Sequence, residues 1–274
     1  MAIITISRGF YSRGREIAGR VAWELGYRCI AREVILDACK EFNIPEIRLK
    51  RAIHDAPSIL ERFTHGREKY IAYFRAALLD RLRTDNVVYH GLAGHFFVEG
   101  VEHVLKVRII ADMEDRITLE MKRERVSREE ASLTLTHDDE ERRKWSLDLY
   151  GIDPGDPNLY DLVIHVTEMS VQDAAYIICN FVSLERFRTT PQSRKTIEDL
   201  ALAAKVKATL VDIRPDVEVF ADNGLVRVDV KVPVEEEEYV AKVLKETVQS
   251  LPGVKRLDLH VAHRVKWSDG RFFP

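Results

Sequence analysis

Residues 2–16 read AIITISRGFYSRGRE, and this stretch decides the fold. Its first five residues form a short apolar run with β-branched side chains, which is typical of a parallel strand buried on both faces. The loop that follows has glycines at positions 9 and 14, the spacing of the phosphate-binding loop G-x-x-x-x-G-K-[ST]. Arg15 stands at the lysine position and Glu16 stands where the magnesium-binding hydroxyl belongs. The spacing alone fits both a phosphate loop and an ordinary turn from a strand into a helix.

Strand and helix patterns alternate along the rest of the N-terminal part. Apolar residues recur at three- and four-residue steps from Ile17 to Leu25, which predicts a helix that ends at Gly26. We expect a helical insertion at residues 45–83 and two or more helices at residues 112–150. Further strands are expected at residues 27–30, 86–90, 105–110 and 161–166. This alternation predicts an α/β fold with a parallel sheet flanked by helices.

The pattern changes after residue 188. Residues 189–193 are short, polar and contain one proline, which is the composition of a linker. Residues 194–264 predict the order helix, strand, strand, helix, strand, with a hairpin turn at Asp222-Asn223-Gly224. We therefore expect a first domain over residues 1–188, a small α+β (αββαβ) domain over residues 194–264, and a tail over residues 265–274.

Composition limits the partners and the compartment. The chain has 274 residues, 46% apolar and 32% charged, which suits one or two globular domains of about 150 residues each. A net charge of -3 provides no global field for nucleic acid or an anionic membrane. The three cysteines and nine histidines show no metal-ligand spacing, so we expect no protein-built metal site. No run approaches the roughly 18 apolar residues that span a bilayer, and no signal-peptide pattern is seen, so we expect a cytoplasmic protein.

Several segments together resemble the cytidylate kinase-like proteins, which are P-loop phosphotransferase relatives whose phosphate loop ends in G-R-E. These segments are residues 6–8, 14–18, 25–27, 32–35 and 155–164. The resemblance extends over roughly residues 1–188. It implies a P-loop kinase-like fold, ATP and Mg²⁺ as cofactors, and the transfer of a phosphoryl group to a nucleoside monophosphate, with cytidylate as the candidate acceptor.

The resemblance also implies roles for individual residues. The residues expected to bind the donor phosphates are Gly9, Ser12, Arg13, Gly14, Arg15 and Glu16. Arg32 matches the family's arginine near the acceptor, although a surface arginine at a helix start fits equally well. His90 ends a predicted strand at the carboxyl edge of the sheet, where it would face substrate or be structural. Arg123 and Arg142 lie within residues 112–150, which the resemblance implies to be the lid that closes over the triphosphate. With Arg15, they would stabilise charge on the transferring phosphoryl group.

The lid arginines have a simpler explanation as well. Residues 101–150 contain 10 basic and 13 acidic residues, so these arginines would equally form solvated ion pairs on the helices. Glu16 likewise would bind the metal, pair with an arginine or favour the helix start. The sequence leaves both questions open.

Four positions depart from the family pattern. Tyr11 and Arg13 stand in a loop that is usually rich in glycine, Ala31 stands where an Asp usually precedes the arginine, and Leu92 stands where an arginine usually follows the glycine. The alternative to a kinase is therefore a catalytically inactive nucleotide-binding or sensing protein on a kinase scaffold.

The C-terminal part resembles a BON domain. The resemblance lies in the hairpin of residues 217–232 and in residues 251–257. It implies a regulatory or assembly module with a small-molecule, lipid or protein ligand. The sequence identifies neither that ligand nor the oligomeric state.

Overall fold

The computed structural model describes residues 2–8, 13–31, 33–45, 67–91 and 94–263. The chain divides into two compact units. The first unit comprises residues 1–64 and 84–194, and the second comprises residues 65–83 and 195–274. The division near residue 194 lies beside the expected linker. The grouping of residues 65–83 with the C-terminal part has no counterpart in the sequence prediction.

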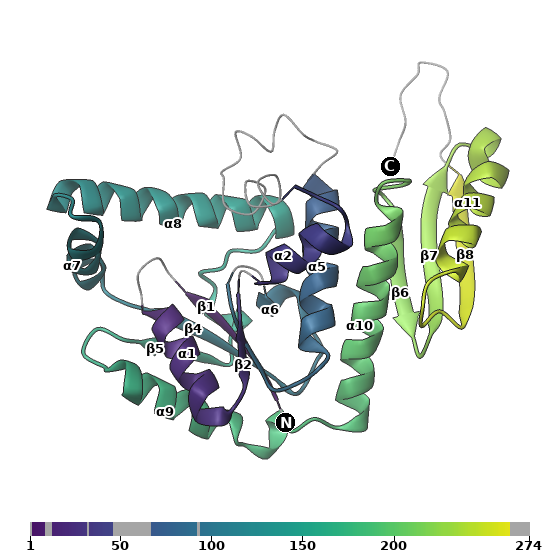
Figure 1. Ribbon diagram of the computed structural model, residues 1–274. Helices are drawn as coiled ribbons and strands as arrows, with labels where there is room; N and C mark the ends of the chain where they lie inside the picture. The colour runs from purple at the N-terminus through teal and green to yellow at the C-terminus, as the bar shows by residue number, and fades with distance from the viewer. Residues whose placement is uncertain (1, 9–12, 32, 46–66, 92–93, 264–274) are drawn as a thin grey trace. The chain divides into compact units, whose positions relative to one another are not determined.

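A five-stranded parallel sheet forms the centre of the first unit (Figure 1). Its strand order is β2-β3-β1-β4-β5. The strands are β1 (Ile3–Arg8), β2 (Arg28–Ile30), β3 (Val87–His90), β4 (Val104–Ile110) and β5 (Leu162–His165). The predicted parallel α/β sheet is therefore confirmed, with each strand within a few residues of its expected position.

The apolar residues of β1 explain its central place in the sheet. Ile3, Ile4 and Ile6 are at most 1% exposed, and successive side chains of a strand point to opposite faces. Helices α1 (Gly14–Leu25) and α9 (Val171–Val182) pack side by side on one face of the sheet (Figure 1). Each fully buried isoleucine stabilises the fold by about 1.5–3 kcal/mol. Because these isoleucines point to both faces, β1 is stabilised by apolar packing on both sides of the sheet.

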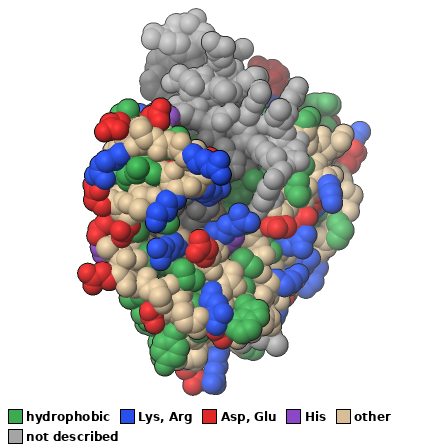
Figure 2. Space-filling model, turned by 60° about the vertical axis from the view of Figure 1, so that its left-hand side comes forward, with side chains coloured by type: hydrophobic (Ala, Val, Ile, Leu, Met, Phe, Trp, Pro, Cys, Tyr) green, Lys and Arg blue, Asp and Glu red, His purple; other side chains and the backbone are tan. Residues whose placement is uncertain are grey.

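Helices α7 (Met113–Glu124) and α8 (Arg128–Tyr150) form a hairpin with a small apolar core of its own. Ile117 on α7 packs with Ala131 and Leu135 on α8, and all three are buried. Acidic and basic side chains are interspersed on the face of the molecule that this hairpin forms (Figure 2). Two or more helices were expected at residues 112–150, and the structure has two, α7 and α8.

Shorter elements complete the first unit. They are α2 (Glu33–Glu41), α6 (Gly94–Phe97) and the 3₁₀ turns η2 (Pro157–Leu159) and η3 (Glu185–Phe187).

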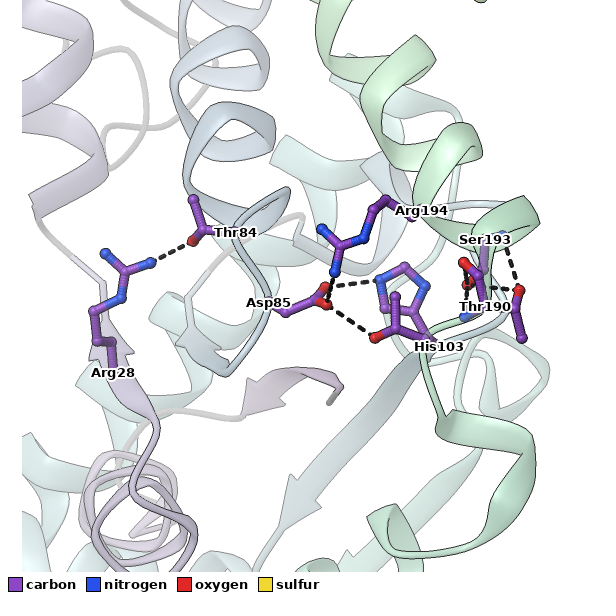
Figure 3. Close-up of polar contacts among 8 residues, drawn as sticks. Arg28, Thr84, Asp85, His103, Thr190, Ser193 and Arg194 are labelled. Atoms are coloured by element: carbon purple, nitrogen blue, oxygen red, sulfur yellow. Dashed lines mark hydrogen bonds and ion pairs between the residues drawn. The ribbon is translucent and has the colours of Figure 1, made fainter.

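A buried carboxylate lies at the amino edge of the sheet (Figure 3). Asp85 accepts hydrogen bonds from His103 Nε2 at 3.1 Å, from Thr189 Oγ1 at 2.9 Å and from Arg194 Nη2 at 2.6 Å. Burial raises the pKa of Asp85. The hydrogen bonds from His103 and Thr189 and the positive charge of Arg194 lower it by more than burial raises it, so the pKa of Asp85 lies below its ordinary value. The carboxylate thus joins three distant parts of the chain as a charged group.

The segment expected as a linker is partly helical. Helix α10 (Pro191–Leu210) begins inside it. The backbone N–H of Thr190 donates to Ser193 Oγ at 3.0 Å, and the N–H of Ser193 donates to Thr190 Oγ1 at 3.0 Å. This reciprocal pair satisfies N–H groups at the start of α10. The polar residues that suggested a linker in the sequence therefore cap a helix. The domain boundary at residues 189–193 stays a prediction.

The second unit contains a three-stranded sheet in the order β6-β7-β8. Strands β6 (Glu218–Asp222) and β7 (Leu225–Val232) pair antiparallel, and β8 (Arg256–His263) pairs parallel with β7. The other elements are α5 (Arg67–Leu82), most of α10, the turn η4 (Val234–Glu236) and α11 (Glu237–Gln249). The expected αββαβ order and the hairpin turn are confirmed, and α5 accounts for part of the expected helical insertion. Within the described ranges, no helix has the length and apolar composition of a membrane span.

We predict that Asp85→Asn lowers the free energy of unfolding by about 2–4 kcal/mol at pH 7, because it removes a buried charge on which three donors converge. The pKa of Asp85 lies below that of an unfolded aspartate, about 3.9. The difference between wild type and variant is therefore complete above about pH 4 and shrinks as the pH falls below that value. Urea denaturation at pH 7 and pH 3.5 measures both quantities.

Glu185→Gln is the matched control, because Glu185 is 87% exposed in its ion pair with Arg188. It should change the free energy of unfolding by less than about 0.5 kcal/mol. Equal effects of the two substitutions would contradict a structural role for the buried carboxylate.

Candidate functional site

The start of α1 lies just beyond the carboxyl end of the central strand. Arg13 is the N-cap residue, with φ 56° and ψ 9°, and its side chain makes no capping hydrogen bond. The first helical hydrogen bond runs from the Ile17 N–H to the Arg13 carbonyl at 3.0 Å. The N–H groups of Gly14, Arg15 and Glu16 precede that bond, so they have no partner within the helix. By contrast, α8 starts with a capping box at Ser127.

Side chains at this helix start suit a negatively charged ligand. Gly14 is buried, whereas Arg15 and Glu16 are exposed. Arg15 makes no ion pair with any residue that the structure describes. N–H groups that the Arg13 side chain does not cap, the positive end of the helix dipole and a guanidinium without an ion pair to a described residue all favour phosphate oxygens. Arg13 has a left-handed backbone, which glycine adopts most easily and which costs about 1–2 kcal/mol for a residue with a side chain.

Several predicted site residues lie outside the described residues. These are Gly9, Ser12 and Arg32, together with Tyr11 and Leu92. Their roles stay predictions. Next to Arg32, the N–H of Ala31 donates to Glu33 Oε2 at 2.8 Å, at the start of α2.

Close packing fixes the backbone after β3. A Cβ atom on Gly91 would lie 2.4 Å from Tyr89 Oη, and one on Gly94 would lie 2.4 Å from two ring carbons of Tyr89. The Tyr89 ring thus occupies the space that side chains at 91 and 94 would need. His90, a predicted substrate-binding residue, is half-buried and pairs in register with Ile6 of β1. It therefore ends its strand beside the central strand, as the sequence predicts.

A second polar cluster is absent from the sequence prediction. The Tyr160 hydroxyl donates to the Pro154 carbonyl at 2.9 Å and lies 3.2 Å from Ser7 Oγ and 3.3 Å from His95 Nε2. Arg108 Nη1 donates to the same hydroxyl at 3.2 Å and also to the Pro154 carbonyl. The cluster joins β1, β4, α6 and the turn before β5. A sequence signal does exist, because Lys106 and Arg108 interrupt the apolar strand VLKVRII.

The surroundings of His95 keep its imidazole neutral. Its side chain is buried, and its ring lies 4.8 Å from the Tyr160 ring, centre to centre. Burial, followed by the positive charges of Arg108 and Lys106, lowers the pKa of His95 to about 3. Near neutral pH the imidazole thus takes part in the cluster through hydrogen bonding, without adding a positive charge.

The lid arginines differ in their surroundings. Arg116 is buried and bonds Asp139 at 2.7 Å, which holds α7 to α8. Arg123 lies in the last turn of α7 and pairs with the adjacent Glu124 at 3.3 Å, with two thirds of its side chain exposed. Arg142 lies on α8 and is half-buried. No contact in the described part of the chain joins Arg123 or Arg142 to Arg15, so their shared catalytic role stays a prediction.

A protein-built metal centre is not found in the described part of the chain, where no three His, Cys, Asp or Glu side chains are grouped to hold an ion. Glu16 is the carboxylate in the first turn of α1.

The chain matches one protein family and is similar to several curated proteins. The model of the Cytidylate kinase-like family matches residues 3–168. The chain is 31% identical over 100 residues to the cytidylate kinase of Pyrococcus horikoshii, covering 36% of this chain and 51% of that protein. It is 33% identical over 93 residues to the cytidylate kinase of Pyrococcus abyssi, covering 34% and 50%. The chain thus spans about half the length of the curated relatives it matches.

One solved structure, an uncharacterized protein from Eubacterium ventriosum, aligns with a TM-score of 0.49 and 16% identity. The alignment covers 66% of this chain and 98% of that one.

We predict that His95→Gln reduces the loss of stability on acidification. Since the folded protein keeps His95 neutral down to about pH 3, whereas an unfolded histidine binds a proton below about pH 6.5, stability falls as the pH drops through this window. The contribution of one such proton is about 1.4 kcal/mol per pH unit. Urea denaturation at pH 7, 6, 5 and 4.5 should show a slope that is smaller by this amount in the variant. Identical slopes would show that His95 is protonated in the folded protein.

Proposed function

The chain belongs to the cytidylate kinase-like family, and we propose that it is an ATP-dependent phosphotransferase of the nucleoside monophosphate kinase type, with cytidylate as the acceptor. The observation that carries the proposal is the start of α1. Directly after the central strand, three N–H groups precede the first helical hydrogen bond, and the exposed Arg15 makes no ion pair with a described residue. In this arrangement, phosphate oxygens would accept hydrogen bonds from the N–H groups at the start of α1.

The donor nucleotide would lie at this helix start. The loop residues proposed to hold its phosphates are Gly9, Ser12, Arg13, Gly14, Arg15 and Glu16. The backbone N–H groups would orient the phosphates, and the Arg15 guanidinium would donate two parallel hydrogen bonds to them. Mg²⁺, when bound with ATP, neutralises charge on the phosphate chain. Glu16 would bind that ion or one of its waters.

Acceptor binding and lid closure complete the proposal. Arg32 and His90 would contact the acceptor at the carboxyl edge of the sheet. Arg123 and Arg142 would approach the transferring phosphoryl group when the α7–α8 hairpin closes. Phosphoryl transfer depends mainly on positioning and electrostatic stabilisation, so no general base is assigned.

An inactive nucleotide-binding or sensing protein is the alternative. The left-handed Arg13, in a loop where relatives have glycine, favours it, because a bulky residue there hinders a close approach of the backbone to phosphate. ADP release from ATP in the presence of CMP, UMP, AMP or GMP separates the two functions. Release with one monophosphate supports the kinase, and ATP binding without release supports the sensor.

The C-terminal part is proposed to be a BON-like regulatory or assembly module. Its αββαβ order and its apolar core between the sheet and α10 and α11 support this proposal. Phosphatidylglycerol vesicles and size-exclusion chromatography test a lipid ligand and an assembly role, respectively.

We predict that Arg15→Ala weakens ATP binding roughly 10- to 150-fold, because a charge-assisted hydrogen bond to phosphate is worth about 1.5–3 kcal/mol. Arg15→Lys should recover part of this loss, since it restores the charge without the planar fork. Isothermal titration of ATP with Mg²⁺ into wild type and both variants measures the three affinities.

Arg20→Ala is the control, because Arg20 lies on the same helix but pairs with Glu24. It should leave the ATP affinity unchanged. Equal affinities in wild type and both Arg15 variants would contradict the phosphate-loop interpretation.

A further inference from the structure

Arg108 is a half-buried arginine whose described hydrogen bonds go to neutral acceptors. Nη1 donates to the Pro154 carbonyl and to the Tyr160 hydroxyl, and the guanidinium carbon lies 5.5 Å from the centre of the Tyr160 ring. Among the described residues, no carboxylate forms an ion pair with Arg108. The guanidinium is therefore held in place, while its charge has no acidic partner among the described residues.

The nearby acidic residue is bound elsewhere. Asp153 accepts a hydrogen bond from the Gly155 N–H at 2.8 Å and pairs with Arg143 Nε at 2.7 Å. These two contacts lower the pKa of Asp153, and Arg108 adds only a weaker electrostatic effect. By comparison, Arg116 and Arg194 in the same unit each have an aspartate partner at 2.6–2.7 Å.

Arg108 also lies beside the strand that leads into the phosphate loop. It pairs in register with Ser7, near the carboxyl end of β1. Tyr160, which bonds Arg108, lies 3.2 Å from Ser7 Oγ. In a parallel α/β sheet, ligands bind at the carboxyl ends of strands where the strand order reverses, and β1 and β4 flank this point.

Two nitrogens of the Arg108 guanidinium are available as hydrogen-bond donors within the described part of the chain. Both described hydrogen bonds of Arg108 come from Nη1, so Nε and Nη2 donate to no described acceptor. These two nitrogens form the edge that grips two oxygens of a phosphate. Lys106 lies two positions from Arg108 on the same strand, and the positive charges of both side chains lower the pKa of the buried His95.

We propose that Arg108 binds the phosphate of the acceptor nucleoside monophosphate, with Tyr160 and Pro154 orienting its guanidinium. The proposal rests on the proposed function, and it adds a substrate-binding residue that the loop and lid motifs do not include. The acceptor carries a phosphate monoester dianion, whose negative charge matches an arginine that has no acidic partner in the described part of the chain. Tyr160 is a positioning residue, since it acts through Arg108.

The test compares CMP, ATP with Mg²⁺, and orthophosphate as ligands of the full chain in isothermal titration. Arg108→Gln removes the charge but keeps an N–H donor for the Pro154 carbonyl. It should weaken CMP binding roughly 10- to 150-fold and leave ATP binding within about twofold. Arg108→Lys should weaken CMP binding less. In turnover, the KM for CMP should rise while the KM for ATP stays constant.

Arg186→Gln is the matched control, because Arg186 also stacks on an aromatic ring, Phe187, but pairs with Asp161. It should leave all three affinities unchanged. Thermal unfolding checks that each variant folds, and if Arg108→Gln does not, Arg108→Lys decides, since it retains the charge and loses only the fork.

Each outcome has a defined meaning. An unchanged CMP affinity in a folded Arg108→Gln protein overturns the proposal, as does an equal loss for ATP and CMP. If wild type binds orthophosphate through Arg108 but binds no nucleotide, the phosphate site is supported and the proposed kinase function fails. If wild type binds ATP but neither CMP nor orthophosphate, Arg108 is not an acceptor site, while the phosphate loop stands.

Discussion

Burial of β1 on both faces is the constraint on which the first unit depends. Ile4 and Ile6 pack under α1 and α9, so the strand has to lie inside the sheet, between β3 and β4. The chain then leaves β1 at the point where the strand order reverses, and α1 starts beyond that edge. The apolar run of β1 thus decides at which edge of the sheet α1 begins, which is where ligands bind in parallel α/β sheets.

The two edges of the sheet differ in whether their charged side chains are paired. At the amino edge, the Asp85 carboxylate is buried and bonded by His103, Thr189 and Arg194, so its charge is balanced within the protein. At the carboxyl edge, Arg15 and Arg108 have no acidic partner among the described residues. Balanced charge at the first edge stabilises the fold. Unbalanced positive charge at the second edge is available to phosphate.

Local patterns in the sequence predicted most of the fold. The helix ending at Gly26 and the hairpin at Asn223-Gly224 are confirmed, since positive φ at these positions follows from local chemistry. The Ser7–Tyr160 contact joins residues 153 positions apart, and the Asp85–Arg194 contact joins residues 109 apart. Such pairs depend on how the strands are ordered, which periodicity does not specify. The spacing of Gly9 and Gly14 suggests a phosphate loop from local sequence alone. The Arg108 cluster does not follow from local sequence in this way, and its one sequence signal is two basic residues in an apolar strand.

The proposed function requires that the start of α1 binds nucleotide phosphates. Titration of ¹⁵N-labelled protein with ATP and Mg²⁺ tests it most directly, because the amide resonances of Gly14, Arg15 and Glu16 report on the N–H groups themselves. We predict that these three resonances shift in a saturable manner and that those of α11 in the second unit do not. Saturable shifts elsewhere with none at these three amides, or no shift at all, would contradict the account.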